Sequence, residues 1–166
     1  MPFALAGLWM LVATGYFDNT GSPCLKFHIQ GVHDTKVELD GIVDTGFTGF
    51  ISMPLVRALP LGLPLYGTST STLADGSSCA AITAQARVTV GERGVQIGIV
   101  TLHGSSSDVL IGMDFLRKFN IALMVTKDHV MLFDESALLN TTQSEAKSAP
   151  APVTSPPTDP HKHHDP

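Results

Sequence analysis

Alternation of apolar and polar residues with a period of two is the strongest structural signal in this chain. Residues 80–90 (AAITAQARVTV) carry one row of apolar side chains: Ile82, Ala84, Ala86, Val88 and Val90. Residues 24–30 (CLKFHIQ) alternate in the same way. Because successive side chains of a β-strand point to opposite faces, this pattern predicts half-buried strands.

Turn-forming residues separate these runs. Residues 18–23 (DNTGSP) predict a hairpin between the first two strands, and residues 91–94 (GERG) predict another turn. Helical character is confined to residues 112–120 (GMDFLRKFN), where Met113, Leu116 and Phe119 share a face, and to a single turn at 54–60. About nine short strands and one helix, without a βαβ rhythm, predict an all-β barrel or sandwich.

Composition limits the function. The 166 residues suffice for one domain, and 43% of them are hydrophobic, so the body is globular. A net charge of −5 without a Lys/Arg cluster argues against a nucleic-acid partner. Cys24 and Cys79 lack metal-ligand spacing and are interpreted as isolated thiols in a reducing compartment. We expect no metal and no cofactor.

The two ends differ from the body, which we expect to span residues 14–135. Residues 1–13 are apolar and form either a buried strand or a targeting segment; no Lys or Arg precedes them, and they are too short to span a bilayer. We therefore expect a cytoplasmic protein, membrane association being unlikely, with a membrane-associated or exported protein as the alternative. Residues 136–166 are rich in proline and are expected to be disordered.

One short stretch contains a carboxylate in an unusual position. In residues 41–54 (GIVDTGFTGFISMP) an apolar run reaches Asp44, breaks at Thr45-Gly46 and resumes at Phe50. An unpaired carboxylate at the end of a buried strand costs free energy. Asp44 is therefore interpreted either as the cap of its own turn or as a functional group.

Three stretches in order resemble the single-lobe, retropepsin-like aspartic proteases over about residues 14–134. They are residues 42–51 (IVDTGFTGFI), 71–82 (STLADGSSCAAI) and 108–116 (DVLIGMDFL). In having Phe47 directly after Asp-Thr-Gly, the chain resembles the prokaryotic branch of this clan. The resemblance implies a small closed β-barrel with one short C-terminal helix.

The resemblance also implies an activity, hydrolysis of peptide bonds by a water molecule that two carboxylates activate. Two carboxylates about 3 Å apart share one proton, so one acts as acid and the other as base. This chain has one Asp-Thr-Gly, because Asn19 interrupts the similar residues 18–21 (DNTG). The second carboxylate would come from a second copy on a two-fold axis. The implied partners are a second copy of the chain and a peptide or protein substrate.

Site residues follow from the same resemblance. Asp44 would be the catalytic carboxylate, Thr45 would bond across the two-fold axis, and the Gly46 N–H would support the carboxylate. The residues implied in substrate binding are Phe47, Thr48, Gly49 and the flap residues Ala74, Asp75, Gly76 and Ser77. Gly112 and Asp114 would be structural, the latter at a helix N-terminus.

A second interpretation keeps the fold but not the activity. In it, the chain is a non-catalytic dimeric peptide-binding module, and Asp44 serves structure alone. An intact Asp-Thr-Gly favours the enzyme, because a binding module has no need for a proton-sharing carboxylate pair.

Overall fold

Strands make up most of the part of the chain that the computed structural model describes, residues 11–72, 76–104 and 108–137. The strands are β1 (Leu11–Thr14), β2 (Tyr16–Phe17), β3 (Pro23–Gln30), β4 (Lys36–Val43), β5 (Ile51–Pro54), β6 (Leu65–Thr72), β7 (Ser78–Thr89), β8 (Gln96–His103), β9 (Leu110–Ile111), β10 (Ile121–Val125) and β11 (Val130–Asp134). The short helices are η2 (Val32–Asp34), α2 (Leu55–Ala58), η3 (Leu59–Leu61) and α3 (Met113–Lys118). The expected all-β fold class is confirmed.

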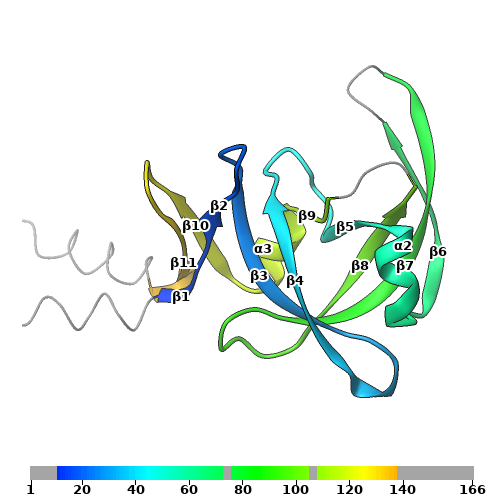
Figure 1. The fold of residues 1–166 in the computed structure, drawn as a ribbon, viewed down its shortest axis with the longest axis horizontal. Helices are drawn as coiled ribbons and strands as arrows, with labels where there is room; N and C mark the ends of the chain where they lie inside the picture. The colour runs from blue at the N-terminus through cyan, green and yellow to red at the C-terminus, as the bar shows by residue number, and fades with distance from the viewer. Residues whose placement is uncertain (1–10, 73–75, 105–107, 138–166) are drawn as a thin grey trace, which may run out of the picture.

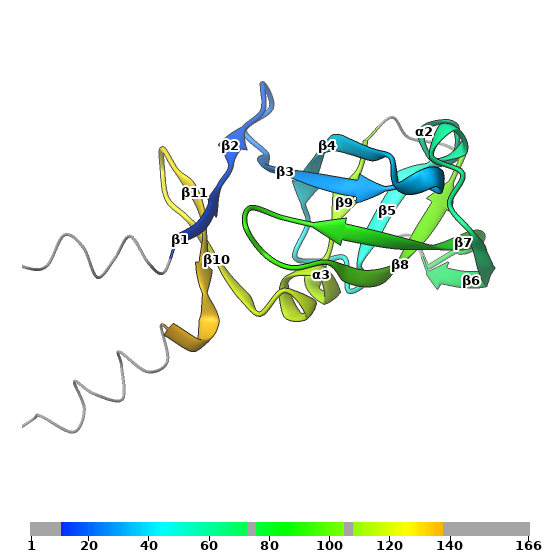
Figure 2. The ribbon, with the colours of Figure 1, turned by 90° about the horizontal axis from the view of Figure 1, so that it is seen from below.

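Two sheets organise these strands (Figure 1). The larger has the order β2-β3-β4-β9-β5-β8-β7-β6. Because β3 also pairs with β7, this sheet curls back on itself. The smaller sheet has the order β1-β11-β10 and lies to one side of the curled sheet, as the view from below in Figure 2 also shows.

The alternation in the sequence matches the burial of the strands. On β3, Leu25, Phe27 and Ile29 are buried, whereas Lys26 and His28 are exposed. The hairpin predicted at residues 18–23 joins β2 to β3, and Tyr16 pairs with Cys24.

The alternation on β7 is only partly buried. Ala84, Ala86, Val88 and Val90 are at most 2% exposed, but Ile82 is 43% exposed. The hairpin of β6 and β7 extends beyond the curled sheet (Figure 1), so the apolar row leaves the core at Ile82.

An aromatic cluster fills the core beneath the loop that follows β4. The ring of Phe115 on α3 lies 4.7 Å from Phe119, 5.3 Å from Phe50 and 5.9 Å from Phe27, measured between ring centroids. These rings come from β3, from the loop before β5 and from α3 with its C-terminal end, so they fix α3 against the sheet. Of the residues predicted to share a face of this helix, Leu116 and Phe119 are buried and Met113 is partly buried. Phe115, which was not predicted on that face, has no exposed surface.

The smaller sheet is attached to the curled sheet by specific contacts. The Gly15 N–H donates to the Val130 carbonyl (2.7 Å), and Arg93 in the turn after β7 donates to the Asp134 carboxylate at the end of β11. At Gly91 of the same turn, a Cβ atom would lie 2.3 Å from the carbonyl oxygen of Val12 on β1. The smaller sheet therefore has a defined position relative to the core.

Some expectations lie outside the described residues. They concern residues 1–10, the centre of the expected flap tip and the Pro-rich tail from residue 138. Within the described ranges, no helix has the length and apolar character needed to cross a membrane.

Candidate active site

Asp44 follows the last residue of β4, where three strands meet. β9 lies between β4 and β5; it runs parallel to β4, with Val43 opposite Ile111, and antiparallel to β5. The Asp44 N–H donates to the Ile111 carbonyl (2.9 Å), which extends the β4–β9 pairing by one bond. The backbone of Asp44 is therefore fixed by the sheet, and its half-buried side chain lies where the sheet ends.

The Asp44 carboxylate accepts one hydrogen bond from the described residues. Its Oδ1 atom accepts a hydrogen bond from the Gly46 N–H (2.8 Å), and its carbonyl accepts one from the Phe47 N–H (3.1 Å). Among the described residues, Oδ2 has no hydrogen-bond partner. The Gly46 contact is the one that the resemblance implied, although a turn that caps itself would also make it.

Backbone bonds tie the loop after Asp44 to the start of α3. The N–H of Gly112 donates to Phe50 (3.1 Å), that of Met113 to Phe47 (2.8 Å) and that of Asp114 to Gly49 (3.1 Å), each to the carbonyl. These are the donors that the first turn of a helix cannot satisfy internally. The loop that presents Asp44 is thus held along its length.

The Phe47 ring packs inward over glycines. A Cβ atom on Gly49 would lie 2.4 Å from the Phe47 Cζ atom, and one on Gly112 would lie 2.6 Å from its Cδ1 atom. On Gly112 the same atom would lie 2.2 Å from the Gly49 carbonyl oxygen, so no side chain fits there. The expected structural role of Gly112 has this close backbone approach as its physical basis.

The remaining loop residues face outward. Thr45, Gly46 and Thr48 are exposed, and Thr45 lines a hollow of about 390 Å³ beside α3 and β10. Asp114 lies in the first turn of α3, whose N-cap is Gly112, and no side chain caps this end.

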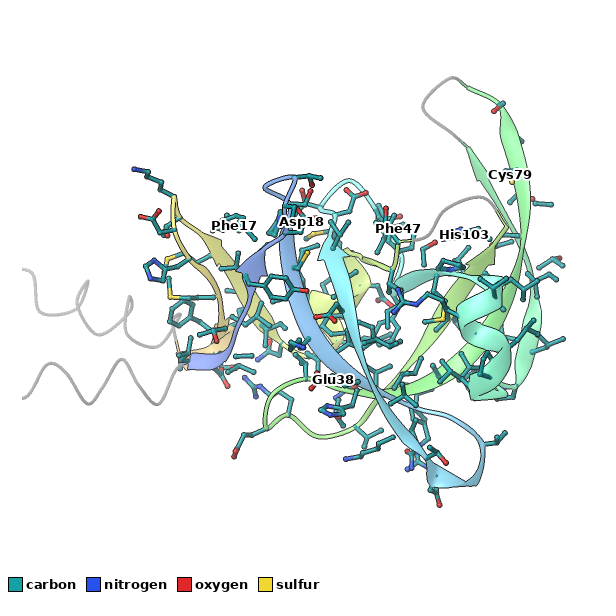
Figure 3. The ribbon with its side chains drawn as sticks, viewed as in Figure 1. Phe17, Asp18, Glu38, Phe47, Cys79 and His103 are labelled. Atoms are coloured by element: carbon teal, nitrogen blue, oxygen red, sulfur yellow. The ribbon has the colours of Figure 1, made fainter. Side chains whose placement is uncertain are left out.

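The expected flap corresponds to the hairpin of β6 and β7. Gly76 has a positive φ of 83° and Ser77 is exposed, whereas Ala74 and Asp75 lie outside the described residues. In Figure 3, Cys79 on this hairpin and Phe47 on the Asp44 loop are both labelled on the upper side of the molecule. Cys24 is buried and Cys79 exposed, and both thiols are free.

The similar residues 18–21 (DNTG) form a different structure. Asp18 Oδ1 accepts hydrogen bonds from Thr20 N–H (2.8 Å), Thr20 Oγ1 (2.7 Å) and Ser22 N–H (2.9 Å). The bond from the Thr20 hydroxyl, followed by that from the Ser22 N–H, holds the pKa of this carboxyl below its ordinary value. Asp18 therefore caps its own turn, within the hairpin that the sequence predicted at residues 18–23.

A ladder of charged side chains covers an exposed face of β3 and β4. Lys26 contacts Glu38 (2.9 Å) and Asp40 (3.6 Å), and the Tyr16 hydroxyl donates to Asp40 (2.7 Å). The bond to Asp40 raises the pKa of Tyr16 to about 12, and the bond to Glu38 raises the pKa of Lys26. These groups are exposed, so their ion pairs contribute little to the stability of the fold. Within the described ranges, no cluster of three or more potential ligands could hold a metal ion.

Sequence reasoning missed two glycines that support the loop. A Cβ atom on Gly98 would lie 2.1 Å from the Phe50 ring, and one on Gly41 would lie 2.7 Å from Ile111. Both lie inside strands, where a glycine often marks the close approach of another group. This signal was present in residues 41–43 (GIV) and 96–100 (QIGIV).

The fold has a counterpart among solved structures. The chain is similar to the crystal structure of a retropepsin-like aspartic protease from Rickettsia conorii, with a TM-score of 0.55 and 21% sequence identity. The match covers 73% of this chain and 89% of that protein. No protein-family profile and no curated protein sequence matches the chain. At this identity the match concerns architecture: the fold is that of a retropepsin-like aspartic protease.

Proposed function

We propose that this chain is an aspartic endopeptidase whose active site forms when Asp44 of two copies meet on a two-fold axis. The observation that carries the proposal is the state of Asp44. Its backbone is fixed by β9, one carboxylate oxygen is held by the Gly46 N–H, and the other has no partner among the described residues. Asp18, which caps its own turn, also leaves Oδ2 without a partner among the described residues, but its Oδ1 accepts three hydrogen bonds, whereas Oδ1 of Asp44 accepts one.

The proposed chemistry needs two carboxylates and one proton. Asp44 of one copy is ionised and takes a proton from a water molecule, whose oxygen attacks the peptide carbonyl carbon. Asp44 of the other copy is protonated and gives its proton to the carbonyl oxygen. The carboxyl that took the proton from water then gives it to the amide nitrogen, and the other carboxylate takes a proton from a hydroxyl of the tetrahedral intermediate. The C–N bond breaks, an amine and a carboxylic acid leave, and the dyad again holds one proton. The loop bonds from Gly112, Met113 and Asp114 would keep the carboxylate in position through these steps.

In this proposal the residues around Asp44 have separate tasks. Thr45 lies exposed next to the carboxylate, where the second copy would contact it. Thr48 and the hairpin of β6 and β7, with Gly76 and Ser77, would contact the substrate, and the hairpin would exclude water.

A matched pair of substitutions tests the enzyme against the binding module. Asp44→Asn and Asp18→Asn each keep a side-chain oxygen that can accept the N–H bonds of its own turn. In a mixed peptide library between pH 4 and 7, the full chain and Asp18→Asn should cleave, and Asp44→Asn should not. If the parent binds peptides but cleaves none, the binding-module interpretation replaces the enzyme.

A further inference from the structure

The hollow that begins at Thr45 is built like half of an interface. Its volume is about 390 Å³, and it lies between α3 and β10. The apolar residues that line it are Met113, Leu116, Ile121 and Leu123. Two charged side chains of opposite sign also line it, Arg117 on α3 and Glu135 just after β11.

Among the described residues, neither charged side chain, Arg117 or Glu135, has an ion-pair partner. At a second hollow, of about 280 Å³ near the start of β4, two charged side chains lie close to each other. There the Arg87 guanidinium lies 4.0 Å from the Asp34 carboxylate of the same chain. The hollow at Thr45 therefore has charges available for an external partner.

The position of Thr45 decides which partner this is. This step rests on the proposed function, in which two Asp44 carboxylates lie about 3 Å apart on a two-fold axis. Because Thr45 follows Asp44 directly and is exposed, the same axis brings the two Thr45 residues together. A surface continuous with Thr45 must then face the second copy.

The open edge of the smaller sheet supports the same partner. β10 is the last strand in the order β1-β11-β10, so one of its edges has no strand beside it among the described residues. Met124 and Val125 at its end are 42% and 47% exposed. An apolar strand with an open edge is a site for association with another chain.

We propose that this hollow is closed by a second copy of the chain, with Arg117 of each copy paired to the partner's Glu135. In a two-fold interface, if one residue contacts a second, the second also contacts the first across the axis. One hollow with a positive and a negative side chain is therefore complementary to itself. The two ion pairs select the antiparallel arrangement in which both Asp44 loops meet.

Charge reversal on the full chain tests this pairing. In Arg117→Glu, the new carboxylate at position 117 faces Glu135 of the other copy, so two negative charges meet at both sites of the dimer. In Glu135→Arg, two positive charges meet at both sites. We expect each variant to form a dimer about tenfold or more weaker than the parent, measured by sedimentation equilibrium. An equimolar mixture of the two variants should recover the dimer, because each copy then meets the opposite charge. Lys118→Glu, an exposed position outside the hollow, is the control and should dimerise like the parent.

Two further measurements make the result decisive. Circular dichroism and thermal melting of each variant show whether it folds; should a reversal not fold, Arg117→Gln and Glu135→Gln replace the reversals, and each should weaken the dimer. Cleavage of the peptide library should fall with dimerisation in each single variant and return in the mixture.

The outcomes separate this inference from the proposed function. If the parent dimerises and cleaves while both reversals dimerise as tightly as the parent, the Arg117–Glu135 interface is wrong and the shared Asp44 site stands. The Arg117–Glu135 interface is also wrong if the mixture of the two reversals does not recover the dimer. A parent that is monomeric at every concentration overturns both.

Discussion

The aromatic ring of Phe47 lies so close to Gly49 that a Cβ atom on the glycine would be 2.4 Å from Cζ and 2.7 Å from Cε2. The three nearest atoms to that position all belong to the Phe47 side chain. Two residues of the same loop are therefore coupled by packing. This coupling fixes the segment that follows Asp44.

A double-mutant cycle tests the coupling. Gly49→Ala should destabilise the protein by about 1–3 kcal/mol, because the ring must move from a packed position. In a Phe47→Ala background the same substitution should be neutral or slightly stabilising, since the obstacle is gone and the glycine loses unfolded-state entropy. Urea unfolding of the four proteins measures this; equal costs in both backgrounds would contradict the packing.

Gly112 should behave differently. A Cβ atom there would lie 2.2 Å from the Gly49 carbonyl oxygen and 2.6 Å from that of Phe47. Removing the Phe47 ring leaves both carbonyl oxygens in place. We expect Gly112→Ala to destabilise the protein strongly and Phe47→Ala not to rescue it, again by urea unfolding.

The contact between Arg93 and Asp134, which attaches the smaller sheet, should stabilise the protein less as the pH falls. The hydrogen bond from Arg93, with a smaller contribution from the Ala137 N–H, holds the pKa of Asp134 below its ordinary value. A lowered folded-state pKa means that the unfolded chain binds more protons in this range. The contribution of Asp134 is therefore complete above the unfolded value of about 3.9 and is lost as pH falls through the folded value.

Thermal melts from pH 2 to 7 measure this contribution. Asp134→Asn should melt below the parent near neutral pH, and the difference should shrink at the acid end. Asp128→Asn, an exposed position in the turn between β10 and β11, is the control and should follow the parent throughout. A difference for Asp134→Asn that is constant with pH would show that the charge is not responsible.

The hairpin of β6 and β7 should need its glycine for turnover more than for folding. Gly76 has a φ of +83° with open space around it, so Gly76→Ala meets no atom but costs about 1 kcal/mol of backbone strain. Gly94 also has open space, at a φ outside the left-handed range, so Gly94→Ala is the control.

The measurement compares stability and cleavage in both glycine variants. Gly76→Ala should lower the rate of peptide cleavage by more than its loss of stability explains, and Gly94→Ala should change neither. Unchanged cleavage with a large loss of stability would mean that the hairpin belongs to the core and does not close over a substrate.

Sequence alone determined the features that depend on neighbouring residues. The period of two predicted β3 and β7, because backbone geometry sends alternate side chains to opposite faces whatever surrounds the strand. The turns at Asp18 and after Asp44 also depend on neighbouring residues, because their hydrogen bonds join residues only two to four positions apart.

The tertiary structure decided what depends on distant residues. Phe115 is completely buried because α3 packs against rings from two other segments, so its buried surface is wider than one helical stripe. Arg93 meets Asp134, 41 positions away, and β1 pairs with β11; no local pattern encodes either contact. The position of Thr45, next to Asp44 in the chain, at the edge of an open hollow likewise arises only when the loop after β4, α3 and β10 pack together. The free energy that places these elements comes from burying side chains between segments far apart in the chain.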